Sequence, residues 1–153
     1  MLITTAHSAN LAVTKLSSMR LHTRAIIRDG RVLIIEDDDS LRGIVARHLR
    51  ANGFHVDEAS SAEGAANVIE GDRRPDVVLL DLHLPGKSGW DLLRGPALNA
   101  AGSPPVILTS ATTVSPKRLA ESGCAAYLPK PFPPEALLAT LERVLGTKSE
   151  SEA

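Results

Sequence analysis

The sequence predicts an α/β fold, a doubly wound sheet of five parallel strands, from two observations on the chain after Arg31. Short runs rich in β-branched residues alternate strictly with stretches of helical apolar spacing, which is typical of strand–helix–strand units with right-handed crossovers. Three of the runs are almost continuously apolar, as expected for parallel strands covered on both faces. These runs are Val32–Ile35, Val77–Leu80 and Val106–Leu108.

The first half of this pattern predicts two helices and a short second strand between the first two apolar runs. Gly53 ends the first helix, Phe54–Val56 forms the second strand, and Ser61–Ile69 forms the second helix. The apolar face of the first helix is made by Leu41, Ile44, Val45, His48 and Leu49. One side of the second helix carries Ala62, Ala65, Ala66 and Ile69.

The second half predicts three more helices and the last strands. A turn at Leu84–Gly89 leads into a third helix from Trp90, and a short fourth helix lies near Lys117–Ser122. The fifth strand is predicted at Ala125–Leu128. The final helix, Pro134–Leu145, opens with prolines, which are tolerated in a first turn, and is expected to stop at Gly146.

Length and composition favour one globular domain with an extension at each end. The 153 residues, 43% apolar and 23% charged, leave room for a single core of about 120 residues. We expect a flexible basic N-terminal extension at residues 1–29, the folded domain at residues 30–147, and a polar C-terminal tail at residues 148–153. The extension has a transit-peptide-like content of Arg and Ser, and an upstream start codon that is not the true one explains it equally well.

Charge, cysteine content and hydropathy exclude several classes of protein. A net charge of −1 supplies no broad basic surface, so direct binding of nucleic acid is not expected. The single cysteine, Cys124, cannot form an intrachain disulfide and is expected to act as a small apolar residue. No apolar run approaches the roughly 20 residues that cross a bilayer. A cytoplasmic protein without membrane contact fits this pattern.

Polar side chains follow the apolar runs, at the edge where ligands bind in open α/β sheets. They are Glu36, Asp37 and Asp38 after the first run, Asp81 after the third, Ser110 and Ala111 after the fourth, and Lys130 after the fifth. Because the carboxyl ends of parallel strands share one edge, the sequence predicts that acids, a hydroxyl and an ammonium group gather there.

Crowded carboxylates repel one another, and a hard divalent cation with oxygen ligands relieves that repulsion, so magnesium is the expected ion. A cation at this position also attracts phosphate oxygens, which allows one carboxylate to act as the nucleophile in phosphoryl transfer. Asp81 is the candidate nucleophile because it ends a buried run and faces the acidic pair Glu36 and Asp37. Lys130 and Ser110 would then hold the phosphoryl oxygens.

Four ordered motifs give the chain, from about Arg31 to Gly146, a specific resemblance to the receiver domains of response regulators in two-component signalling. The motifs are VLIIEDDDSLRGIVARHL, DVVLLDLHLPGKSGWDLL, PPVILTSA and AAYLPKPF. The resemblance implies a flavodoxin-like sheet with strand order 2-1-3-4-5, as in single-domain chemotaxis regulators. It also implies a signalling switch, not an enzyme, that accepts a phosphoryl group on Asp81 and slowly hydrolyses it.

By the same resemblance, magnesium would lie among Glu36, Asp37, Asp81 and the backbone carbonyl of His83. Ser110 and Ala111 would meet the phosphoryl group with Lys130, and Tyr127 would rotate inward. That rotation would reshape the face made by the fourth helix, fifth strand and fifth helix. The implied partners are a sensor histidine kinase or histidine phosphotransfer protein, and a downstream protein target.

Three departures from the family pattern accompany this resemblance. Gly95-Pro96 falls inside the third helix and predicts a kink or an early break, because an interior proline removes a hydrogen bond. The segment between Ser110 and Tyr127 is short, so the fourth helix is expected to be short or irregular. His83 stands two residues after Asp81, where the family varies its side chain and influences the approach of hydrolytic water; the phosphoryl lifetime is left open.

Other functions remain as alternatives. A phosphate-independent interaction module of the same fold is favoured by the altered third and fourth helices and opposed by the intact acids and Lys130. A hydrolase of the haloacid dehalogenase kind would need a second acid two residues after the nucleophile, where His83 stands. The chain also fits a piece of a hybrid kinase or of a longer regulator. The cognate kinase, the signal, the output partner and the oligomeric state are not set by the sequence.

Each site residue also has an ordinary structural interpretation. Acids favour helix N-termini, and we expect Asp38 and Asp39 to have that capping role. Lys130 alone would be an exposed loop charge, and Tyr127 a core aromatic with a solvated hydroxyl. Of the two hydroxyls that end the fourth run, Thr109 is expected to point into packing and Ser110 into the site. The joint occurrence of these residues at strand ends favours the functional interpretation.

Overall fold

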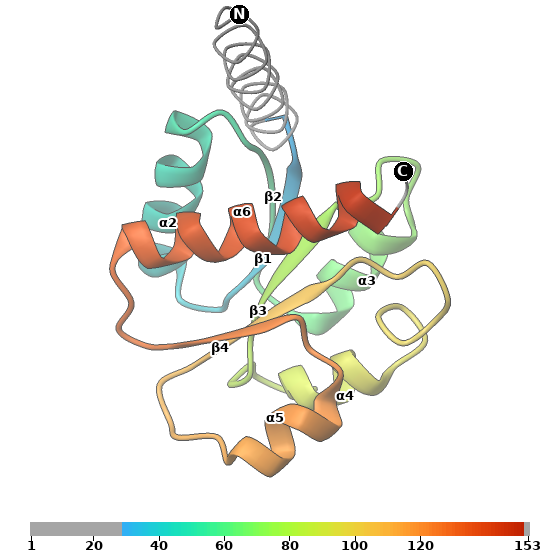
Figure 1. Cartoon of the computed structure of the whole chain (residues 1–153). Coiled ribbons are helices and arrows are strands. Elements are labelled where there is room, and N and C mark those ends of the chain that lie inside the picture. The colour runs from blue at the N-terminus through green and yellow to red at the C-terminus, as the bar shows by residue number, and fades with distance from the viewer. Residues whose placement is uncertain (1–28, 152–153) are drawn as a thin grey trace, which may run out of the picture.

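A computed structural model describes residues 29–151, and the N-terminal segment Met1–Arg28 lies outside the described residues (Figure 1). The strands are β1 (Arg31–Ile35), β2 (His55–Ala59), β3 (Val77–Asp81), β4 (Val106–Ser110) and β5 (Ala126–Pro129). The helices are α2 (Asp39–Ala51), α3 (Ala62–Glu70), α4 (Gly89–Arg94), α5 (Pro116–Ser122) and α6 (Pro134–Ser151). All strand pairs are parallel and the order is β2-β1-β3-β4-β5, which confirms the predicted fold.

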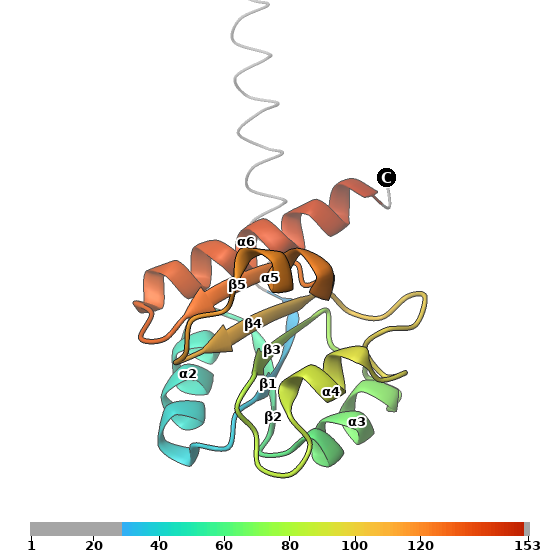
Figure 2. The same ribbon diagram turned by 90° about the horizontal axis from the view of Figure 1, so that it is seen from below.

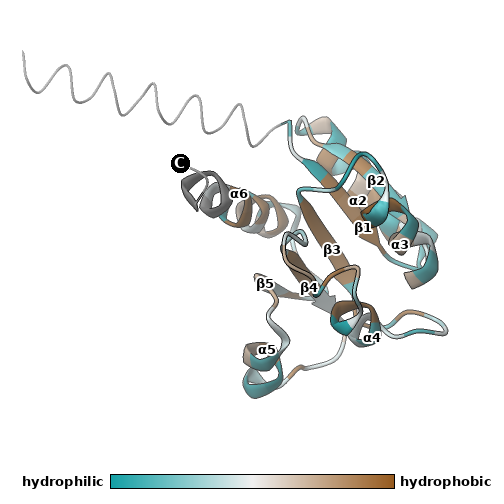
Figure 3. Ribbon diagram, turned by 90° about the vertical axis from the view of Figure 1, so that its right-hand side faces the viewer, coloured by the Kyte–Doolittle hydropathy of each residue, from teal (hydrophilic) through white to brown (hydrophobic). Residues whose placement is uncertain are grey.

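The sheet separates two apolar layers, because successive side chains of a strand point to opposite faces. Val32 and Ile34 of β1 pack with α2 and α6, whereas Leu33 and Ile35 pack with α3 and α4 (Figure 2). Every residue of β3 and β4 is buried. Figure 3 shows the hydrophobic strands at the centre and hydrophilic outer faces on α2 and α3. Within the described residues, no helix is long and apolar enough to span a membrane.

Helix α2 begins where the acidic run predicted a cap. The Asp38 side chain accepts a hydrogen bond from the backbone N–H of Leu41 at 3.0 Å, which satisfies one free donor of the first turn. Asp39 is the first helical residue and forms an ion pair with Arg42 at 2.6 Å. The helix ends at Asn52 and Gly53, whose φ of 92° suits glycine.

Two predictions on the first strands and helices were wrong in detail. Ile44 is 55% exposed and not on the buried face, because that face is centred on Val45, Ala46 and Leu49, and adjacent helical residues are about 100° apart. Strand β2 continues to Ala59 instead of ending at Val56. The polar residues of β2 do not give an apolar strand pattern, so the sequence did not show its full length. They lie at the sheet edge and pair with arginines, as in Arg31–Asp57 at 2.8 Å and Arg50–Glu58 at 2.9 Å.

The expected break in the third predicted helix is confirmed. Helix α4 has six residues and ends at Arg94, with Gly95 as its C-cap directly before Pro96. Its first turn is held by a capping box in which the Ser88 and Asp91 side chains each accept a backbone hydrogen bond from the other residue. The Ser88 hydroxyl and the Ser88 backbone N–H both donate to the Asp91 carboxylate and lower its pKa. Helix α5 is also short, with seven residues, as predicted.

The predicted end of the last helix at Gly146 was wrong. Helix α6 continues to Ser151, and Gly146 is not among the glycines with positive φ. A glycine inside a helix costs only about 1 kcal/mol relative to alanine, so the backbone hydrogen bonds on both sides can carry the helix through it. The chain is therefore helical up to Ser151.

Candidate functional site

The acids that follow β1 and end β3 meet at one edge of the sheet. Ile35 lies in register with Leu80, so Glu36 and Asp81 project from neighbouring strand ends. One carboxylate oxygen from each of Glu36, Asp37 and Asp81 lies within 4.8 Å of the others. The structure thus brings together the three acids that the sequence predicted would converge.

The acids differ in exposure in a way that suits a metal ion. Glu36 and Asp81 are only 6% and 4% exposed, whereas Asp37 is exposed and leaves the cluster open to solvent. Carboxylates that lie this close together, two of them buried, repel each other. Divalent cations that prefer oxygen ligands neutralise such clusters. The donor set therefore fits magnesium. The backbone carbonyl of His83 stays a predicted fourth ligand.

Lys130 reaches this cluster from the loop after β5. Its Nζ lies 2.6 Å from Glu36 Oε2 and 3.2 Å from Asp81 Oδ2, and its backbone N–H donates to Ser110 O at 2.8 Å. Burial opposes the charged ammonium, but the hydrogen bond to Glu36 and the charge of Asp81 outweigh it and raise the pKa of Lys130. Lys130 is thus a fixed cation beside Asp81 and not an exposed loop charge.

Burial raises the pKa of Glu36, and the nearby charge of Asp81 adds to the rise. The hydrogen bonds from Lys130 and from the backbone N–H of Asp38, the latter at 3.1 Å, only partly offset it. In the metal-free protein, folding therefore disfavours the ionised form of Glu36. A bound cation would stabilise that ionised form.

Ser110, His83 and Thr112 form a hydrogen-bonded group beside the acids. Ser110 Oγ accepts the backbone N–H of Thr112 at 3.0 Å and lies 3.4 Å from His83 Nδ1. Thr112 Oγ1 lies 3.3 Å from His83 Nε2 and 3.1 Å from Ser110 Oγ. The backbone N–H of His83 donates to Asp81 Oδ1 at 3.1 Å, so the group is joined to the candidate acceptor.

The other predicted residues lie around this group. Ser110 is buried and Ala111 exposed, while the Tyr127 hydroxyl donates to the backbone carbonyl of Thr112 at 3.2 Å. Thr109 is buried with its hydroxyl near Leu80 O, as expected for a packing residue. Thr112 was missed by the sequence reasoning. Its hydroxyl two residues after Ser110 was visible, but only the fold shows that it contacts both His83 and Tyr127.

We expect the raised pKa of Glu36 to make Glu36→Gln stabilising in metal-free protein at pH 7. A group with a raised folded pKa binds its proton more tightly when folded, so its ionised form lowers the free energy of unfolding. This deficit shrinks as the pH falls through the raised pKa towards the ordinary value of 4.5. Urea unfolding of both proteins with a chelator should give a stability difference that decreases on acidification. A difference that grows on acidification would contradict the assignment.

A family model and curated relatives both match the chain. The family model of the response regulator receiver domain matches residues 32–142. Response regulator MprA of Mycobacterium avium is 36% identical over 126 residues, which cover 80% of this chain and 54% of MprA. The chain therefore spans about half the length of the curated relatives it matches.

Two solved structures match over nearly their whole length. A CheY-like response regulator receiver domain protein from Methanospirillum hungatei has a TM-score of 0.72 at 25% identity, covering 82% of this chain and 99% of that one. The receiver domain of a sensor histidine kinase from Pseudomonas aeruginosa has a TM-score of 0.67 at 26% identity, covering 77% and 98%. That structure holds a magnesium ion coordinated in its active-site cleft.

Proposed function

The chain belongs to the family of response regulator receiver domains, which act in two-component signalling, and on that premise we propose that Asp81 is its phosphoacceptor. The observation that supports this most is the position of the Asp81 carboxylate. It lies within 4.8 Å of the Glu36 and Asp37 oxygens and 3.2 Å from Lys130 Nζ. A nucleophilic carboxylate, a cation-binding acid pair and a fixed ammonium group are the parts that phosphoryl transfer needs.

In the proposed reaction, an oxygen of Asp81 forms a bond to phosphorus while the bond from phosphorus to a donor histidine nitrogen breaks. The electron pair stays on the imidazole, which takes a proton from solvent. Glu36, Asp37, Asp81 and the His83 carbonyl would hold magnesium, which would neutralise charge on the transferred oxygens. Lys130 stabilises the same charge from the other side, because its ammonium already lies beside Asp81.

Ser110 is proposed to exchange its present partners for a phosphoryl oxygen, with Ala111 lining the same group. Its hydroxyl is now bonded within the group that contains His83 and Thr112. Because Thr112 also accepts the Tyr127 hydroxyl, movement of Ser110 would loosen the bond that holds Tyr127. This link supports a switch that acts on the face formed by α5, β5 and α6, the element set that the sequence predicted.

The partners and setting follow from the same proposal. Receiver domains of response regulators interact with histidine kinases, and we propose a sensor histidine kinase or histidine phosphotransfer protein as the donor. A downstream protein would read the α5-β5-α6 face. We propose a cytoplasmic setting, without direct nucleic-acid or membrane contact by the described domain. Chemistry is limited to self-catalysed phosphoryl transfer and slow hydrolysis of the acyl phosphate.

A phosphate-independent interaction module stays the second candidate, because α4 and α5 have only six and seven residues. Such a module should show no magnesium-dependent change in the fluorescence of Trp90, the single tryptophan. A saturable change on adding magnesium, reversed by a chelator, favours the switch.

Incubation with acetyl phosphate and magnesium is expected to add one phosphoryl group to each protein chain, as seen by intact mass. Removing magnesium with a chelator should reduce the rate at least about 100-fold, because the ion then no longer offsets the charge on the phosphoryl oxygens. The same magnesium-containing buffer with and without chelator forms the matched pair. Equal phosphorylation in both buffers would contradict the metal-dependent mechanism.

A further inference from the structure

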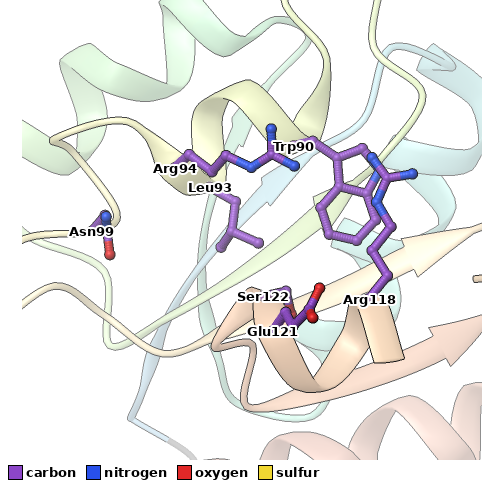
Figure 4. Close-up of a pocket in the computed structure, with 7 residues that line it drawn as sticks. All are labelled: Trp90, Leu93, Arg94, Asn99, Arg118, Glu121 and Ser122. Carbon is purple, nitrogen blue, oxygen red and sulfur yellow. The ribbon is translucent and has the colours of Figure 1, made fainter. Parts of the chain in front are cut away.

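A cavity of about 310 Å³ lies between α4, the loop that follows it, and α5 (Figure 4). It shares no residue with the acidic site. Its lining includes Trp90, Leu93, Arg94, Asn99, Arg118 and Glu121. The volume is at the lower end of the range for small-molecule sites, which are usually about 300–1,000 Å³. Helix α4 ends before Gly95, and Asn99 in the segment that follows it lines the cavity.

Two guanidinium groups face the cavity from opposite helices. Arg94 is the last residue of α4 and Arg118 lies on α5; Figure 4 shows both beside Trp90. Both arginines are exposed, and neither forms an ion pair within 4.0 Å with any residue in the described part of the chain. Two like charges at the rim of one recess repel each other, and an anion between them would relieve that repulsion more fully than Asp91, which attracts Arg94 alone.

Arg118 is held in place by an aromatic contact. Its guanidinium carbon lies 4.2 Å from the centroid of the Trp90 ring. Stacking fixes the plane of the group and leaves its N–H edge free, which is the geometry that binds carboxylates and phosphates through paired hydrogen bonds. The stack therefore pre-orders one of the two cations before any ligand arrives.

The rest of the lining sets the size and polarity of the ligand. The Leu93 side chain points into the cavity from α4 and supplies an apolar wall. Asn99 is exposed and lies across the cavity from Trp90. Glu121 has only a distant ion pair with Lys117, at 4.0 Å. An amide and a carboxylate there would accept N–H or O–H groups of a ligand.

We propose that this cavity binds a small metabolite that carries a phosphate or carboxylate at one end and hydrogen-bond donors at the other. The anionic end lies between Arg94 and Arg118, and the donor groups face Glu121 and Asn99. A nucleoside monophosphate has this chemistry and approximately this size, and it serves as the probe. Because α5 forms one wall, a bound ligand would restrain a helix of the proposed output face.

Titration of the whole 153-residue chain with AMP, followed by Trp90 fluorescence, tests the proposal. Saturable binding is expected, and Arg94→Ala should raise the dissociation constant about tenfold, a loss of ~1.4 kcal/mol. Arg94 is exposed and does not take part in the stack on Trp90, so this variant should fold and keep its reporter. Arg118→Lys keeps the charge without the planar fork and should also weaken binding.

Arg47→Ala is the matched control, because Arg47 is an exposed arginine on α2, outside the cavity, and its loss should leave AMP binding unchanged. Inorganic phosphate and succinate, at constant ionic strength, distinguish phosphate from carboxylate as the preferred anion. The proposal is overturned if none of the three probes saturates, or if Arg94→Ala binds AMP as wild type does. If only a poly-glutamate peptide gives a response, the cavity is a protein-docking surface, and the proposal of a metabolite site is overturned.

Discussion

Replacing Asp81 with asparagine is expected to abolish phosphorylation by acetyl phosphate. The amide oxygen is a much weaker nucleophile than a carboxylate, and the change also removes one negative charge from the metal cluster. The substitution is nearly isosteric, so the bonds to the His83 N–H and Lys130 can be kept in part. Intact mass after incubation with acetyl phosphate and magnesium should show labelling reduced to background, at least about 100-fold below wild type.

Asp72→Asn is the matched control for this change, because Asp72 is exposed and lies away from the acidic cluster. It should take up label at the wild-type rate. Asp81→Asn should also be folded and at least as stable as wild type, since it removes repulsion with Glu36. If Asp81→Asn accepts the phosphoryl group as readily as wild type, another residue is the acceptor and the proposed function fails.

Replacing Gly89 with alanine is expected to destabilise the fold by ~3 kcal/mol and to disturb the site. A Cβ atom at Gly89 would overlap the backbone carbonyl oxygen of Asp81 and lie 2.8 Å from Leu82 Cα. Both obstacles are backbone atoms that cannot rotate away, so relief requires α4 to separate from the end of β3. Urea unfolding measures the loss, and phosphorylation by acetyl phosphate should slow because the strand end that carries Asp81 moves.

Gly43→Ala is expected to change the stability of the protein in the opposite direction, and so serves as a matched control. Gly43 lies inside α2, and a Cβ there would meet only Arg47, at 4.0 Å. Alanine should therefore stabilise the protein by roughly 0.5–1 kcal/mol, the usual gain for glycine replaced inside a helix.

Equal unfolding midpoints for wild type and Gly89→Ala would show that α4 does not need its close approach to β3.

The fold and the acidic cluster could be predicted because their signals are local in sequence. Continuous apolar runs such as Val77–Leu80 identify buried parallel strands, and polar residues directly after them must lie at one edge of the sheet. Gly95-Pro96 likewise ended α4 where predicted, because proline restricts the backbone beside it. The residue pattern alone thus determined the parallel α/β class, the meeting of Glu36, Asp37 and Asp81, and the short third and fourth predicted helices, whereas the sheet order came from the resemblance to receiver domains.

The tertiary structure decided the features that depend on contacts between distant segments. The exposure of Ile44, the continuation of α6 past Gly146, and the bonds of Thr112 to His83 and Tyr127 are of this kind. So is the recess where Arg94 and Arg118 meet. Residues at strand ends are placed by backbone hydrogen bonding, which a periodic pattern encodes. Side chains on separate helices and loops are placed by packing, which no single stretch of sequence specifies.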